Sequence, residues 1–217
     1  MYRLLHLLLL AALLVASAPS RADTVVKDPD DPFGAAILGT GFSYVYANSF
    51  VAPNDGEVTE IGVWLRGTSA GKVRFEVYDS LGGDPSLGPD ARALLARSPV
   101  ATGYYQDLSF VDFTSGIASF GDLVGGRTYW VAASVVDLCS CARYNVASHL
   151  RNTDGIVDNG QFWWSDDPAG LVFKGNWPGE EMAFSVTVSP VPEPASYAML
   201  ALGLGLCAGL RRARRRA

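Results

Sequence analysis

Tryptophan and acidic residues gather in one stretch of the chain, which has 217 residues. Trp163 and Trp164 are adjacent, Asp166 and Asp167 follow them, and Trp177 lies in a Gly-Asn-Trp-Pro segment. Flat aromatic rings stack on the C–H faces of sugars, and carboxylates accept hydrogen bonds from sugar hydroxyls. The combination predicts a glycan-binding site formed by these five residues.

A structural role for the same rings is the alternative. Adjacent residues of a strand point to opposite faces, so at most one of Trp163 and Trp164 can lie fully in a core. The other ring covers a sheet edge, packs under a loop or meets a ligand. The pattern leaves these uses of the second ring open.

One segment matches a catalytic motif, because residues 67–71 have the pattern Gly-x-Ser-x-Gly. In α/β hydrolases this nucleophile lies between a strand and a helix, with an acid and a histidine later in the chain. Here one expected strand ends at Arg66 and another begins at Lys72, and His149 is the only histidine beyond the first 22 residues. We therefore expect a hairpin turn of small residues and no nucleophile.

Paired carboxylates do not indicate glycoside hydrolysis either. Glu180 and Glu181 are adjacent, as are Asp166 and Asp167, and neighbouring strand residues diverge instead of facing one substrate. We expect a protein that is not an enzyme. A polysaccharide-active hydrolase or lyase is the alternative.

Cys139 and Cys141 are separated by one residue, and the remaining cysteine lies near the C-terminus. In an oxidising compartment this pair is expected to form a disulfide. The loop that it closes is very short, so the gain in chain entropy is small. Free thiols and a redox role are the alternatives.

We expect no metal and no other cofactor. A single histidine cannot supply a zinc ligand set. Calcium needs only oxygen ligands, and Asp154 and Asp158 lie in a loop rich in Asn and Asp. These two residues are weak calcium candidates, because their spacing does not follow an EF-hand.

Between the two ends of the chain, apolar and polar residues alternate with a period of two. The clearest rows occupy residues 61–65, 73–77, 129–135 and 182–188. Weaker strands are expected at residues 44–51, 94–98, 108–113, 142–147 and 161–164. Strands with one apolar face, separated by Gly- and Pro-rich turns, require two packed sheets. We therefore expect an all-β fold, a single antiparallel, jelly-roll-like β-sandwich over residues 23–190.

The charge of the chain is unevenly distributed. The formal net charge is −5, but residues 23–190 carry ten Lys and Arg against 21 Asp and Glu, a charge of −11. A body this acidic repels phosphate backbones, so nucleic acid is excluded as a partner.

The N-terminus has the features of a secretory signal peptide. Arg3 precedes an apolar run over residues 4–16, and small residues then offer cleavage sites after Ala18 or after Ala22. Residues 1–22 are therefore assigned to a signal peptide.

The C-terminal segment, residues 191–217, combines a short motif, an uncharged stretch and a basic end. Pro192, Glu193 and Pro194 precede the 16 uncharged residues 195–210. As a helix this stretch is roughly 24 Å long, slightly short for a bilayer core of about 30 Å. A basic cluster follows it: Arg211, Arg212, Arg214, Arg215 and Arg216. These cations hold that end in the cytoplasm, so a short transmembrane helix is predicted.

This order of parts resembles the PEP-CTERM sorting signal of exported proteins from Gram-negative-type bacteria and cyanobacteria. The resemblance implies recognition of Pro192, Glu193 and Pro194 by exosortase, a membrane-embedded cysteine transpeptidase. It also implies export through the inner membrane, anchoring by the tail and a final place on the envelope surface or in the extracellular matrix.

The body is similar to the choice-of-anchor and carbohydrate-module-like sandwiches that precede such tails. The similarity rests on residues 48–50, 58–65, 73–79 and 123–131, the last containing Gly-Arg-Thr-Tyr-Trp. It implies a structural or carbohydrate-binding role, with exosortase, the export machinery, the membrane and extracellular polysaccharide as partners. A self-associating architectural surface protein is a further alternative.

Overall fold

The computed structural model describes residues 22–27, 34–39, 44–67, 71–103, 109–136, 143–150, 162–167, 172–176 and 180–190, together with Gly203. Ala22–Ser189 forms one compact unit, which is the subject of this section. Apart from Ala22 and Gly203, the predicted signal peptide, sorting motif, arginine cluster and membrane helix lie outside the described residues. So do the side chain of His149 and three further predictions: the disulfide of Cys139 and Cys141, the calcium candidates Asp154 and Asp158, and the glycan contact of Trp177. Within the described residues, no helix is long and apolar enough to cross a membrane.

The first of two sheets, sheet A, has seven strands. Its main order is β1 (Asp23–Lys27), β14 (Phe184–Ser189), β4 (Glu57–Gly67), β10 (Arg143–Leu150) and β13 (Glu180–Met182). In addition, β2 (Gly34–Gly39) pairs with β10, and β7 (Ser109–Phe113) pairs with β4.

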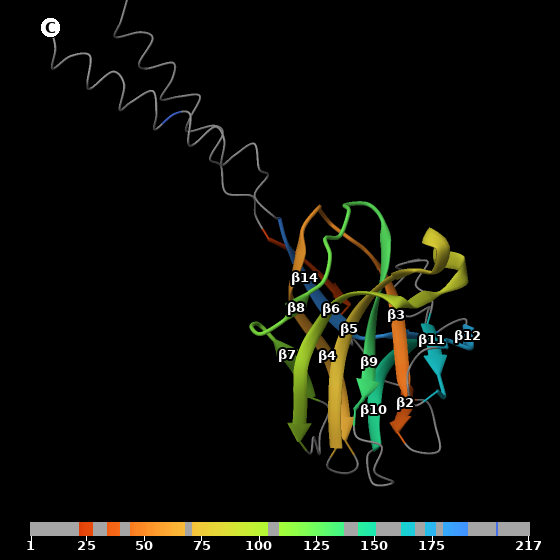
Figure 1. The fold of residues 1–217 in the computed structure, drawn as a ribbon. Coiled ribbons are helices and arrows are strands. Elements are labelled where there is room, and N and C mark those ends of the chain that lie inside the picture. Colours follow the sequence, from red (N-terminus) through yellow and green to blue (C-terminus); the bar gives the residue numbers. More distant parts are fainter. Residues whose placement is uncertain are drawn as a thin grey trace, which may run out of the picture. The chain divides into compact units, whose positions relative to one another are not determined.

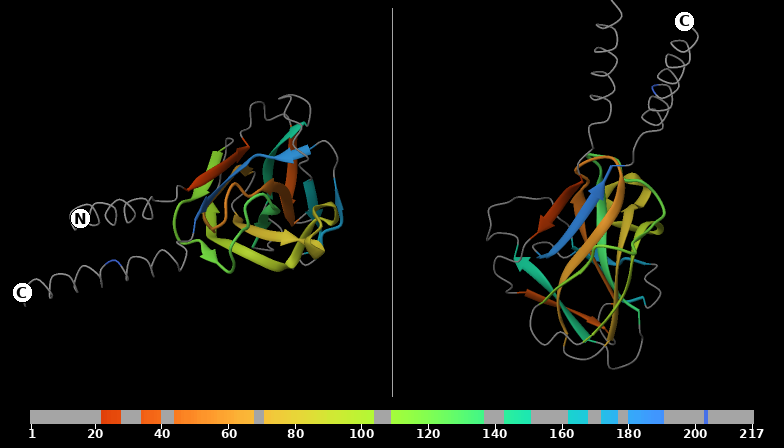
Figure 2. Two further views of the ribbon diagram at one scale, coloured as in Figure 1. Left: turned by 90° about the horizontal axis from the view of Figure 1, so that it is seen from above. Right: turned by 90° about the vertical axis from the view of Figure 1, so that its left-hand side faces the viewer.

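The second sheet, sheet B, also has seven strands and crosses the front of Figure 1. Its order is β12 (Gly175–Asn176), β11 (Phe162–Ser165), β3 (Val45–Val51), β9 (Thr128–Val135), β5 (Gly71–Ser80), β6 (Pro89–Gly103) and β8 (Ala118–Ser119). The described strand pairs of both sheets are antiparallel. The views in Figure 2 show the two sheets facing each other, with β1 beside β14. The predicted all-β antiparallel sandwich is confirmed.

The main core lies between the sheets and follows the alternation of the sequence. On β4 of sheet A, Ile61, Val63 and Leu65 are fully buried. On β5 of sheet B, Phe75 is fully buried in the same cluster, and its ring packs edge-on against Phe113 with ring centroids 5.8 Å apart. Burial of one apolar row from each strand supplies the main free energy of this fold.

A second, smaller apolar cluster covers the outer face of sheet B. It contains Val45, Ala47, Tyr78, Trp130 and Ala132, with Tyr44, Leu94, Trp163 and Phe173 packed against it. The segment after β5, which includes the 3₁₀ turns η1 (Leu81–Gly83) and η2 (Pro85–Leu87), contributes Gly88 to this layer. Sheet B is therefore partly buried on both faces.

The connection at residues 67–71 differs from the expected hairpin. β4 ends at Gly67 in sheet A, and β5 begins at Gly71 in sheet B, so the prediction of a hairpin is wrong. The two strands place their apolar rows on opposite walls of the core, which requires the chain to change sheets between them. β6 is also much longer than the expected strand at residues 94–98, because pairing with β5 extends it in both directions.

Removal of a core ring tests this arrangement. Phe75→Ala deletes a fully buried side chain, and we expect a loss of about 3–5 kcal/mol in the free energy of unfolding. Phe120 is 58% exposed, and Phe120→Ala should change this free energy by less than about 0.5 kcal/mol. Urea unfolding followed by tryptophan fluorescence measures both. Equal losses for the two variants would contradict the position of the core.

Candidate functional site

A buried carboxylate organises the polar part of the outer face of sheet B. Glu76 is 2% exposed and extends from β5 on the side opposite Phe75 and Val77. Its Oε2 accepts hydrogen bonds from Tyr78 Oη at 2.9 Å and Ser134 Oγ at 2.7 Å. A carboxylate without such donors would lose its hydration at a large cost in free energy.

Two arginines complete the coordination of this carboxylate. Arg97 Nε donates to Oε1 of Glu76 at 2.9 Å, and Arg74 Nη2 lies 3.0 Å from the same oxygen. Strand register brings the groups together, because Glu76 on β5 pairs with Arg97 on β6 while Arg74 pairs with Ser134 on β9. Three hydrogen bonds and the ion pair with Arg74 surround a carboxylate with about four lone-pair positions, so Glu76 has no position left for a ligand.

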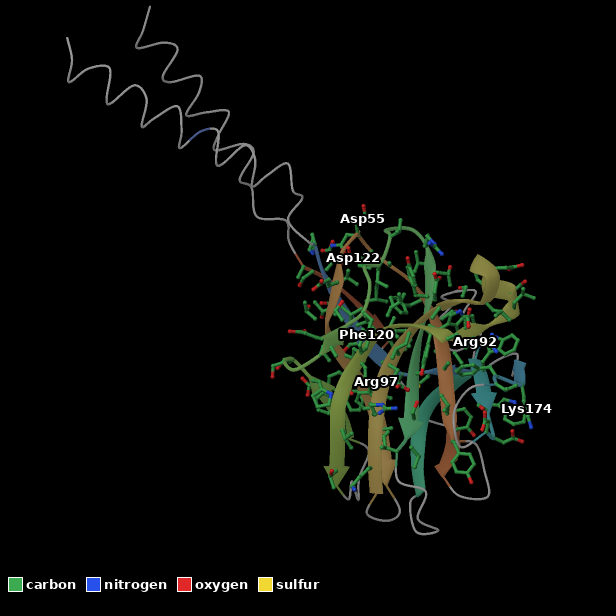
Figure 3. All side chains as sticks on the ribbon, in the orientation of Figure 1. Asp55, Arg92, Arg97, Phe120, Asp122 and Lys174 are labelled. Atoms are coloured by element: carbon green, nitrogen blue, oxygen red, sulfur yellow. The ribbon has the colours of Figure 1, made fainter. Side chains whose placement is uncertain are left out.

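Only part of each arginine side chain takes part in binding Glu76. The side chains of Arg74 and Arg97 are 27% and 39% exposed, and each contacts Glu76 through a single nitrogen. Arg74 Nε is buried and has no hydrogen-bond partner in the described part of the chain. Figure 3 shows Arg97 on the side of β6 that faces the viewer, with Arg92 farther along the same strand.

Tyr78 joins the carboxylate to the aromatic part of this face. Its phenol donates to Glu76, and its ring packs edge-on against Phe173 with ring centroids 6.1 Å apart. Burial, and then the nearby negative charge of Glu76, raise the pKa of Tyr78 well above its usual range. The phenol therefore remains a neutral donor at any physiological pH.

The aromatic part centres on Trp130, which is fully buried on β9 and donates from its indole nitrogen to Ser80 Oγ at 3.1 Å. The ring of Trp163 meets it edge-on, with ring centroids 6.3 Å apart and an interplanar angle of 82°. A Cβ on Gly88 would lie 2.8 Å from the Trp163 ring, so only glycine allows this close approach. Trp163 is thus held between Trp130 and the segment that follows β5.

The structure separates the two predicted tryptophans. Trp163 packs in the outer cluster of sheet B, and Trp164 packs against the main core, both half-buried. Asp166 is exposed and forms an ion pair with Lys174 at 2.6 Å. The backbone N–H of Asp167 donates to Ser165 Oγ at 3.1 Å. Whether these residues contact a glycan stays a prediction.

Reasoning from the sequence did not identify Glu76, Arg74, Arg97 or Trp130 as site residues. The signal available was the alternation Arg-x-Glu-x-Tyr on β5, which places three polar or amphipathic groups on one face. Arg97 and Ser134, which also contact the Glu76 carboxylate, come from β6 and β9. The register in which these two strands pair with β5 brings them to Glu76, and the sequence does not reveal that register.

The residues that the structure describes contain no group of three His, Cys, Asp or Glu side chains arranged to hold a metal ion. The predicted calcium candidates lie outside them.

Comparison with protein families gives a match at the C-terminal end of the chain. Residues 190–216 match the PEP-CTERM protein-sorting motif. A comparison with curated proteins found no match to the chain. The predicted sorting tail is therefore confirmed, and the chain is an exported protein that exosortase sorts through this tail.

The raised pKa of Tyr78 predicts a dependence of stability on alkaline pH. The folded-state pKa lies above the unfolded value of about 10, so the contribution of Tyr78 to stability is present in full below about pH 10 and is lost as the pH rises further. We expect the free energy of unfolding to fall above about pH 10, and to fall less steeply in Tyr78→Phe, which cannot ionise. Urea unfolding at a series of pH values measures this difference. Parallel declines in both proteins would contradict the assignment.

Proposed function

We propose that this exported protein is a non-enzymatic component of the envelope surface or extracellular matrix, and that its sandwich binds extracellular polysaccharide. The observation that carries the proposal is the position of Trp163 on the outer face of sheet B. Its ring is half-buried and held by Trp130, and the exposed ion pair of Asp166 with Lys174 begins at the residue that follows the same strand, β11. This combination offers an aromatic surface for a sugar face and charged groups for its hydroxyls.

Pre-organisation supports a binding role for this face. The contacts of Trp163 with Trp130 and Gly88 fix the ring before any ligand arrives. A ring that is already ordered loses little side-chain entropy on binding, so more of the contact free energy appears as affinity.

A non-enzymatic role is supported by the state of Glu76. Glycoside hydrolysis uses two carboxyl groups facing one bond, about 5–9.5 Å apart, one of which must exchange a proton. The Glu76 carboxylate already accepts from Tyr78, Ser134 and Arg97 and lies within 3.0 Å of Arg74. It serves as a structural anchor for the donors around it.

The architectural alternative is association through strand edges. In sheet B, β8 pairs with only Ala96 and Arg97 of the fifteen-residue strand β6, so most of the outer edge of β6 has no strand partner among the described residues. An edge of this kind is where self-association of the sandwich would take place.

Binding to the host's own extracellular polysaccharide tests the proposal. With the full chain purified in detergent, we expect saturable quenching of tryptophan fluorescence. Trp163→Ala should weaken binding at least about tenfold, as expected for a central aromatic anchor. Trp177→Ala tests the second predicted contact.

Phe110→Ala is the matched control, because Phe110 is an aromatic residue 39% exposed on sheet A, paired with Trp64. Its affinity should equal that of the unmodified protein. Circular dichroism establishes that each variant is folded. A flat titration with the unmodified protein would refute the polysaccharide-binding role.

A further inference from the structure

Arg74, Arg97 and Glu76 form a cationic site on the surface of an acidic domain. Two guanidinium groups share one carboxylate, so the three side chains carry a net charge of +1. The region 23–190 as a whole carries −11. An anionic polymer is repelled by such a body in general, and its binding requires a local site where cations are fixed.

Glu76 holds the two guanidinium groups in place but contacts only some of their N–H donors. Arginine presents five N–H donors in a planar fork, and Glu76 occupies one nitrogen of Arg97 and one of Arg74. Both guanidinium groups remain partly exposed, whereas the Nε of Arg74 is buried and lies out of reach of a ligand. The N–H groups that the two side chains present to solvent can bind a second carboxylate, which arginine binds in a bidentate manner.

The cationic site lies on the same face of sheet B as Trp163. Trp163 is on β11, and β3 and β9 separate that strand from β5, which bears Arg74. At about 4.8 Å per strand, the two positions are about 14 Å apart, and Arg97 on β6 lies about one strand farther. The positions in register between them, Ala47, Ala132 and Glu76, are buried. A ligand long enough to span this distance therefore meets the exposed parts of the Trp163 ring and of the two guanidinium groups, and not the strands between them.

We infer that the outer face of sheet B selects acidic polysaccharides, with Arg97 and Arg74 binding the carboxylate groups of uronic acid units. This inference rests on the proposed polysaccharide-binding function and names the class of its ligand. The aromatic ring supplies affinity for a sugar face, and the arginine pair supplies the preference for a charged sugar.

The first test compares two polymers on the unmodified full chain in detergent. Polygalacturonate carries a carboxylate on each sugar, and its fully methyl-esterified form has the same backbone without the charge. We expect the ester to bind at least about tenfold more weakly, the loss typical of a charge-assisted hydrogen bond. Higher salt should weaken binding of polygalacturonate, because the contacts are partly exposed. Equal affinity for both polymers overturns the inference.

The second test removes one guanidinium. Arg97→Gln should weaken polygalacturonate binding about ten- to hundredfold and leave binding of the methyl ester unchanged. Arg97→Lys keeps the charge without the fork and should give an intermediate affinity. Arg92→Gln, on the same strand β6, is the matched control and should bind as the unmodified protein does.

The outcomes separate this inference from the proposed function. If Trp163→Ala abolishes binding while Arg97→Gln binds both polymers normally, the binding role stands and the acidic selectivity is refuted. If neither polymer nor the host polysaccharide binds, both are refuted. Thermal unfolding of Arg97→Gln shows whether it folds, and the ester comparison decides the question without any variant.

Discussion

The buried carboxylate of Glu76 is the group on which the outer face of sheet B depends. A carboxylate removed from water must be matched by donors, and here Tyr78, Ser134, Arg97 and Arg74 supply them from three adjacent strands. The requirement fixes the rotamers of long side chains that would otherwise move freely in solvent. The need to satisfy one buried ionic group thereby fixes the positions of two partly exposed guanidinium groups and of one buried phenol.

Sheet B satisfies two packing demands at once. Its inner rows, such as Val73, Phe75 and Val77, close the main core against sheet A, and its outer row buries Trp130 and Tyr78 under a second layer. Strands buried on both faces tolerate little change in register, since a shift of one residue would exchange the two rows. The site therefore lies on a sheet that is packed on both faces, and a binding surface gains from such rigidity.

The sorting tail and the sandwich contribute at different levels. The tail assigns the protein to export and exosortase sorting through a short linear motif that any body can carry. The contribution of the body must come from its own surface, whose net charge is strongly negative. Among its cations, Arg74 and Arg97 are the two that share one buried carboxylate and so carry a local net positive charge.

The amino-acid sequence by itself determined the sorting signal and the all-β class, because both are local patterns: a linear motif in one case and a period of two in the other. It also required Trp163 and Trp164 to point apart, but which ring faces the core followed only from pairing of β11 with β3. The crossing between sheets after Gly67 and the four donors around Glu76 were likewise decided by tertiary structure. Glu76 and Ser134 are 58 residues apart, and no local pattern encodes the register that brings their side chains within hydrogen-bonding distance.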